Sequence, residues 1–93
     1  MRYVVVIHKD EDSDYGVTVP DMAGCFSVGR TIEEALENVV EAIECHLEAM
    51  MFDGEKIPEN LTIEHHRKNP DYTEGIWGIV EVKPENLKVK IAA

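Results

Sequence analysis

An amphipathic helical pattern between Ile32 and Met51 limits the folds that are open to this chain. Apolar residues recur there at spacings of three and four, the period of one buried helix face. Thr31 is a good N-cap, Glu34 completes a capping box three residues later, and Gly54 stands where the helix should stop. A helix with one apolar stripe has to bury it against another element, and the flanking segments predict that this element is a sheet.

Strand-like segments lie on both sides of the predicted helix. Residues 2–8 are mostly β-branched and aromatic, and the unbroken apolar run at 4–7 predicts a strand buried on both faces or central in its sheet. Residues 15–19 complete a hairpin, and further strands are predicted at 25–28 and 76–82. The order β-β-β-α-β predicts an α+β fold with an antiparallel sheet and one long helix packed on one face.

A chain of 93 residues is long enough for one domain with one modest core. We expect residues 1–54 to form the β-β-β-α core. Residues 55–93 should supply a linker, a short helix at 62–68, the Trp-containing strand and a tail, with a last extended piece at 87–91.

The charge balance excludes one class of partner and favours another. Nineteen acidic residues against nine basic ones give a net charge of −10, which opposes binding to nucleic acid phosphates and suits a basic protein. The chain also has no apolar run long enough for a membrane span and no signal peptide pattern, so we expect a cytoplasmic protein without a membrane partner.

No candidate catalytic or metal-binding residues have the spacing that such a site requires. The acidic run at 10–14 lacks the glycine and flanking helices of an EF-hand, which favours a solvated turn. The four histidines form no ligand motif, and no serine or cysteine lies in a nucleophile elbow. We therefore expect neither an enzyme nor a metal or cofactor site. A metal-dependent nuclease using Asp10 or Asp12 is the last-ranked alternative.

Three further residues have simple structural interpretations. Cys25 and Cys45 have no paired ligand spacing, so we expect two reduced thiols that behave as small buried apolar groups. Trp77 is the only tryptophan, and we favour a core position over a role as a binding anchor, although tryptophan is enriched in interfaces.

One segment matches a known family motif. Residues 19–38 follow the pattern φPDφxGCφxxGxTxEEAφxN, in which φ is apolar, without a gap. With the strand and acidic turn before it, this segment resembles the N-terminal domain of the HicB antitoxin family, and residues 77–82 resemble the family's later Trp-containing strand. We expect Pro20, Gly24 and Phe26 in the motif to serve turn geometry and packing rather than contact.

The resemblance implies a partial RNase H-like fold with a curved sheet. It also implies an antitoxin that binds and neutralises HicA, a small basic mRNA-cleaving toxin, as a homodimer or tetramer. Family members commonly continue into a segment that binds operator DNA, which is not evident here and is expected to be absent or truncated. The toxin-binding residues are expected on the acidic helix face and the late strand: Glu37, Glu41, Glu44, Glu48 and Trp77. The sheet edge is a rival surface, and a self-associating adaptor or ligand-sensing domain without a toxin is the alternative function.

Overall fold

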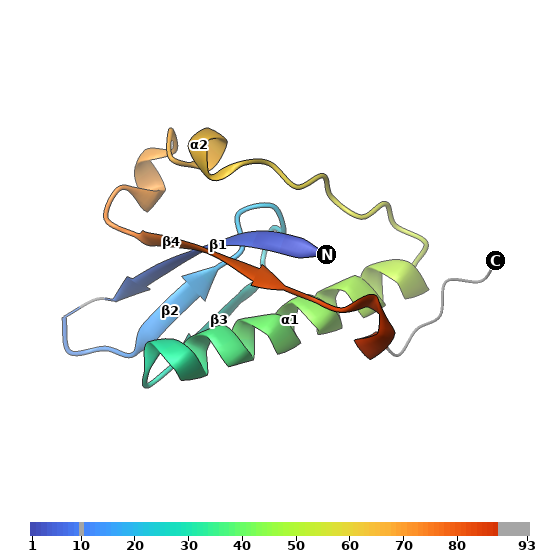
Figure 1. Cartoon of the computed structure of the whole chain (residues 1–93), viewed down its shortest axis with the longest axis horizontal. Coiled ribbons are helices and arrows are strands. Elements are labelled where there is room, and N and C mark those ends of the chain that lie inside the picture. The colour runs from blue at the N-terminus through green and yellow to red at the C-terminus, as the bar shows by residue number, and fades with distance from the viewer. Residues whose placement is uncertain (10, 88–93) are drawn as a thin grey trace.

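The computed structural model describes residues 1–9 and 11–87 and shows a four-stranded antiparallel sheet packed against one long helix (Figure 1). The order of strands across the sheet is β3-β2-β1-β4, so β3 and β4 are its edges. The α+β class and the order of elements predicted from the sequence are confirmed. The elements are β1 (Arg2–Lys9), β2 (Tyr15–Thr18), β3 (Phe26–Gly29), α1 (Ile32–Phe52), α2 (Ile63–His66) and β4 (Ile76–Glu81).

The central strand is the one with the unbroken apolar run. β1 pairs with β2 on one side and with β4 on the other, so Ile7 lies opposite both Val17 and Ile76. Val4 to Ile7 are all buried. A central strand covered on both faces requires such a run, because side chains point alternately to the two faces.

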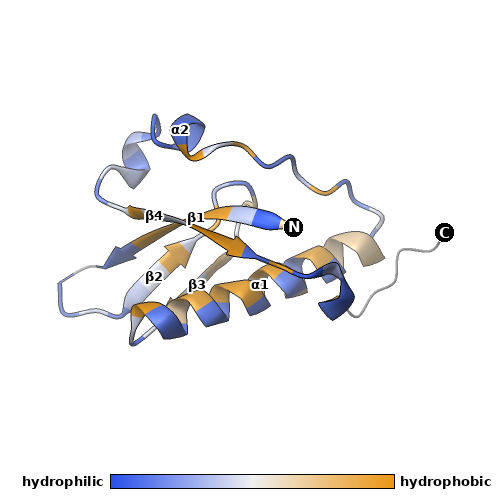
Figure 2. Ribbon diagram, in the orientation of Figure 1, coloured by the Kyte–Doolittle hydropathy of each residue, from blue (hydrophilic) through white to orange (hydrophobic). Residues whose placement is uncertain are grey.

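Helix α1 begins and ends at the predicted signals. The Thr31 hydroxyl accepts a hydrogen bond of 3.0 Å from the backbone N–H of Glu34, and Gly54 has a φ of 71° just after the helix. The helix reaches Phe52, one residue beyond the expected end. Figure 2 shows its apolar and polar residues alternating in bands along its length.

The core lies between α1 and one face of the sheet. Every fourth residue of the helix from Ala35 to Leu47 is fully buried, against inward side chains of β1 and β2 such as Val5 and Val17. Burying an aliphatic side chain of this size stabilises the fold by about 1.5–3 kcal/mol. Gly29 permits the close approach of the helix, since a Cβ there would lie 2.8 Å from the Cα of Ala35.

The chain after α1 returns across the opposite face of the sheet, and Figure 1 shows α1 and α2 on opposite sides of it. A short 3-10 turn at Pro70–Tyr72 follows α2, and another at Pro84–Asn86 follows β4. The third strand begins at Phe26, one residue later than expected. The extended piece predicted at 87–91 lies outside the described residues beyond Leu87.

No helix in the part of the chain that the structure describes is long and apolar enough to cross a membrane.

Candidate protein-binding surface

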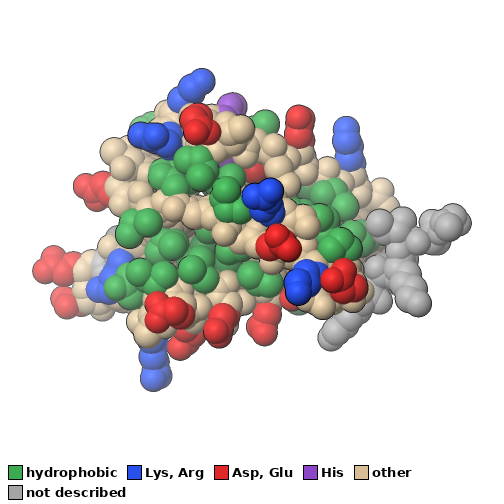
Figure 3. Space-filling model, viewed as in Figure 1, with side chains coloured by type: hydrophobic (Ala, Val, Ile, Leu, Met, Phe, Trp, Pro, Cys, Tyr) green, Lys and Arg blue, Asp and Glu red, His purple; other side chains and the backbone are tan. Residues whose placement is uncertain are grey.

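The outer side of α1 carries the acidic row predicted from the sequence. Glu37 and Glu41 are exposed, and Glu44 and Glu48 are half-buried. Figure 3 shows acidic side chains gathered along the edge of the molecule over this helix. Since the helix period brings residues three and four apart together, these four glutamates form one negatively charged side.

Trp77 lies far from this acidic row. It is on β4 opposite Val6, whose neighbours Val5 and Ile7 point toward α1, so Trp77 projects from the other face of the sheet. It is half-buried rather than in the core, and its ring packs edge-on against Tyr72 with 5.7 Å between ring centroids. The structure therefore groups the four glutamates but not Trp77 with them, and the core position favoured for Trp77 is wrong.

Strand β3 is one edge of the sheet, the rival contact surface predicted from the sequence, and it exposes two apolar side chains. Phe26 is 66% exposed and Val28 is 58% exposed, whereas Ser27 between them is buried and donates a 2.8 Å hydrogen bond to the carbonyl of Ala35. The two apolar side chains of β3 therefore point toward solvent, and the small residues Ser27 and Gly29 face the helix. The packing role expected for Phe26 is wrong. The alternation of large apolar and small residues over 26–29 was the sequence signal that could have indicated this exposure.

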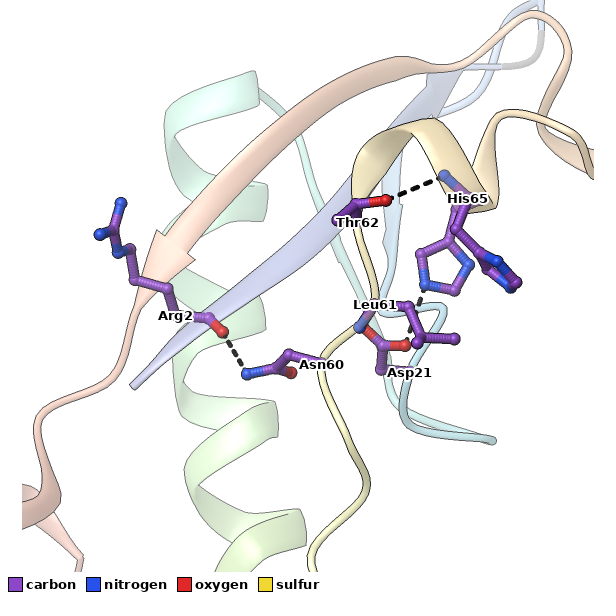
Figure 4. A network of polar contacts seen from close by, with 7 residues as sticks. Arg2, Asp21, Asn60, Leu61, Thr62 and His65 are labelled. Atoms are coloured by element: carbon purple, nitrogen blue, oxygen red, sulfur yellow. Dashed lines mark hydrogen bonds and ion pairs between the residues drawn. The ribbon is translucent and has the colours of Figure 1, made fainter.

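The loop before β3 fastens α2 to the sheet. The side chain of Asp21 is 2% exposed, and its carboxylate lies 2.9 Å from Nε2 of His66 and accepts the backbone N–H of Leu61 at 3.2 Å. Figure 4 shows this network together with the bond from the Asn60 amide to the carbonyl of Arg2. This link was not predictable from the sequence, because no local spacing pattern joins residues 45 positions apart.

The turn geometry expected for Gly24 is present, since its φ is 80°. A side chain would strain this conformation, although nothing lies within 4 Å of where a Cβ would be. The loop is also held by backbone bonds, including Cys25 N–H to the carbonyl of Met22.

The two cysteines have different surroundings, so the expectation of two buried thiols is right for Cys25 and wrong for Cys45. Cys25 is in the core, where burial raises the pKa of its thiol, whereas Cys45 is exposed on α1. Burial, with the nearby charges of Asp21 and Cys25, also raises the pKa of the Tyr3 hydroxyl.

The described residues offer no metal-binding constellation. None of their histidines, cysteines and acids form a group of three or more that could hold an ion. Asp12 lies in the hairpin turn with a φ of 64°, while Asp10 is outside the described residues. His8 contacts the hydroxyl of Thr18 at 3.2 Å, beside a cavity of about 360 Å³ that also touches Tyr72.

Comparison with known proteins gives concordant matches. The family model described as HicB_like antitoxin of bacterial toxin-antitoxin system matches residues 3–92. The Burkholderia pseudomallei antitoxin HicB superposes with a TM-score of 0.85 at 38% identity, covering 97% of this chain and 69% of that one. A chain of the HicA3 and HicB3 toxin-antitoxin complex gives a TM-score of 0.75 at 32% identity, covering 90% of this chain and 100% of that one. An uncharacterized 14.9 kDa protein of Haemophilus phage HP1 is 41% identical over 90 residues, which are 97% of this chain and 67% of that protein.

Proposed function

This chain belongs to the HicB-like antitoxin family of bacterial toxin-antitoxin systems, and on that premise we propose that it binds and neutralises a small basic HicA-type toxin. The observation that carries the proposal is the likeness of its fold to a chain of the HicA3 and HicB3 complex, over nine tenths of its length. Neutralisation here is a binding event, in which the antitoxin covers the catalytic or RNA-binding surface of the toxin.

The charge distribution supports a basic partner. The net charge is −10, and the exposed carboxylates of Glu37 and Glu41 project from α1. Their electric field attracts a positively charged protein before the two proteins make contact. Complementary charges of this kind raise the association rate more than the final affinity. We propose that the row Glu37, Glu41, Glu44 and Glu48 steers the toxin.

Calorimetric titration against a purified HicA-type toxin tests the proposal, with cleavage of RNA by that toxin followed in the same mixtures. We expect tight binding and loss of cleavage at equimolar antitoxin. A folded sample that does not bind, or that binds without stopping cleavage, would contradict the proposed function and favour a self-associating adaptor.

Steering is tested separately by the variant Glu37→Lys/Glu41→Lys/Glu44→Lys. The association rate should fall about tenfold or more at low salt and lose most of its salt dependence, because the attractive field is reversed. The matched control Glu59→Lys/Glu74→Lys/Glu85→Lys changes exposed acids outside α1. Equal slowing by both triple variants would show that only net charge matters.

We also propose that the chain forms a homodimer or tetramer. Sedimentation velocity over a range of concentrations measures this state directly. A monomer at micromolar concentration would exclude it.

A further inference from the structure

The net negative charge is concentrated in one part of the chain. Residues 10–55 contain thirteen of the nineteen acidic residues and one basic residue, Arg30. The remaining residues contain six acidic and eight basic side chains. The described residues 11–55 supply β2, β3 and α1 and carry twelve acidic residues and one basic residue, so the side of the molecule with edge strand β3 is acidic. The described residues 1–9 and 56–87, which include β4, carry six acidic and six basic residues and are close to neutral.

An apolar surface lies uncovered on this acidic side. Ser27 and Gly29 face α1, so Phe26 and Val28 project from the opposite face of the sheet. The segment after α1 covers only the other half of that face, where Leu61 and Thr62 line a cavity with Val4 and Ile79. Phe26 and Val28 remain more than half exposed as a result.

One flank of α1 places carboxylates beside the same edge. The Asn38 side chain reaches β3 and donates a 2.8 Å hydrogen bond to the carbonyl of Val28. Glu34 and Glu41 lie four residues before and three residues after Asn38, so helix geometry puts them on its flank. Glu37, Glu44 and Glu48 lie further round the helix from Asn38.

We propose that the β3 edge, formed by Phe26 and Val28 with Glu34 and Glu41 beside them, is where the basic toxin docks. The inference rests on the proposed function and names its contact surface. Phe26 and Val28 fill an apolar depression of the partner, and the two carboxylates receive its lysine or arginine side chains. An apolar centre with a charged rim is the arrangement that concentrates binding energy in interfaces.

Two alternative modes fit the contacts less well. Addition of a partner strand along β3 would need free edge carbonyls, and the carbonyl of Val28 already accepts the Asn38 amide. Docking on Trp77 would place a basic protein on the part of the molecule whose described residues carry as many basic as acidic side chains, away from the acidic part.

The test compares two double variants that each remove two exposed apolar side chains. Phe26→Ser/Val28→Ser alters the β3 edge, and Ile76→Ser/Ile79→Ser alters the opposite edge strand, where the residues are 60% and 54% exposed. Titration against the HicA-type protein should give at least about a tenfold higher Kd for the first variant and less than about a twofold change for the second.

Hydrogen exchange of the unaltered chain supplies a readout that needs no substitution. Residues 24–30 should gain protection on toxin binding, and residues 76–81 should not. Protection confined to 76–81, or a Kd that rises only for the Ile76→Ser/Ile79→Ser variant, would overturn the proposal while leaving the antitoxin function intact. Failure of the unaltered chain to bind would overturn the proposed function itself, and this inference with it.

A second copy of the chain is the competing occupant. Sedimentation velocity of Phe26→Ser/Val28→Ser distinguishes it: loss of self-association with unchanged toxin affinity would assign the surface to self-contact and overturn the proposal.

Discussion

Asp21 and His66 are 45 residues apart, yet Nε2 of His66 lies 2.9 Å from Oδ1 of Asp21. Both side chains are shielded from solvent, with 2% of Asp21 and 11% of His66 exposed. The pair ties the loop before β3 to α2, which lies on the face of the sheet opposite α1. Asp21, a residue of the family motif, therefore helps to hold α2 in place.

We expect Asp21→Ala to lower the free energy of unfolding by about 2 kcal/mol, because it leaves His66 and the N–H of Leu61 without their acceptor. Hydrogen exchange should accelerate in residues 61–66. Urea unfolding measures the first effect, and Asp14→Ala in the exposed hairpin turn is the control. Equal stability of the two variants would show that the buried pair adds nothing.

Gly29→Ala should destabilise the fold by about 1–3 kcal/mol, because the new Cβ would meet backbone of α1 that cannot move aside cheaply. Gly78→Ala is the matched control in β4, where the nearest atom would be 3.7 Å away. Thermal unfolding of both variants tests the difference. A Gly29→Ala protein as stable as Gly78→Ala would mean that the helix shifts freely over β3.

Asn38→Ala removes the amide that occupies the edge carbonyl of Val28. We expect a loss of about 1 kcal/mol and stronger self-association at high concentration, because an unprotected edge strand pairs with other chains. Sedimentation velocity and urea unfolding measure these effects, with Asn86→Ala as an exposed control. Unchanged association would argue that β3 is protected by its short length alone.

Stability should fall in alkaline solution. Burial raises the pKa of Cys25 above its ordinary 9.0, and burial followed by nearby charges raises that of Tyr3 above its ordinary 10.0. The unfolded chain then loses these protons at lower pH than the folded protein does. The folded state is therefore fully favoured below about pH 9 and loses stability as the pH rises through and above the ordinary values.

Urea unfolding between about pH 8 and about pH 10.5 measures this slope. Cys25→Ala should flatten it, whereas Cys45→Ala should leave it unchanged because Cys45 is exposed. The same pair predicts thiol reactivity, with Cys45 modified quickly and Cys25 only on unfolding. Equal slopes in the two variants would contradict a role for Cys25.

The local elements were predictable because their signals are local. Thr31, Glu34 and Gly54 mark the ends of α1, and the apolar run in β1 marks the central strand. The acidic side of α1 followed from the same helix period. The division at residue 54 and the toxin-binding residues remain predictions.

The placement of side chains across the sheet was not predictable in the same way. Phe26 was expected to pack, but the inward positions of β3 need residues as small as Ser27 and Gly29 for α1 to approach. Trp77 was expected in the core, but its strand pairs with β1 in a register that points it away from α1.

The sequence by itself determined the α+β class, the order of elements, the ends of α1 and the negative charge, because periodicity, capping and composition are written in neighbouring residues. Only the tertiary structure decided that Asp21 meets His66, that Phe26 and Val28 stay exposed, and that Trp77 lies far from the acidic helix. These relationships depend on strand register and on which face of the sheet each segment covers, and both are set by contacts between residues far apart in the chain.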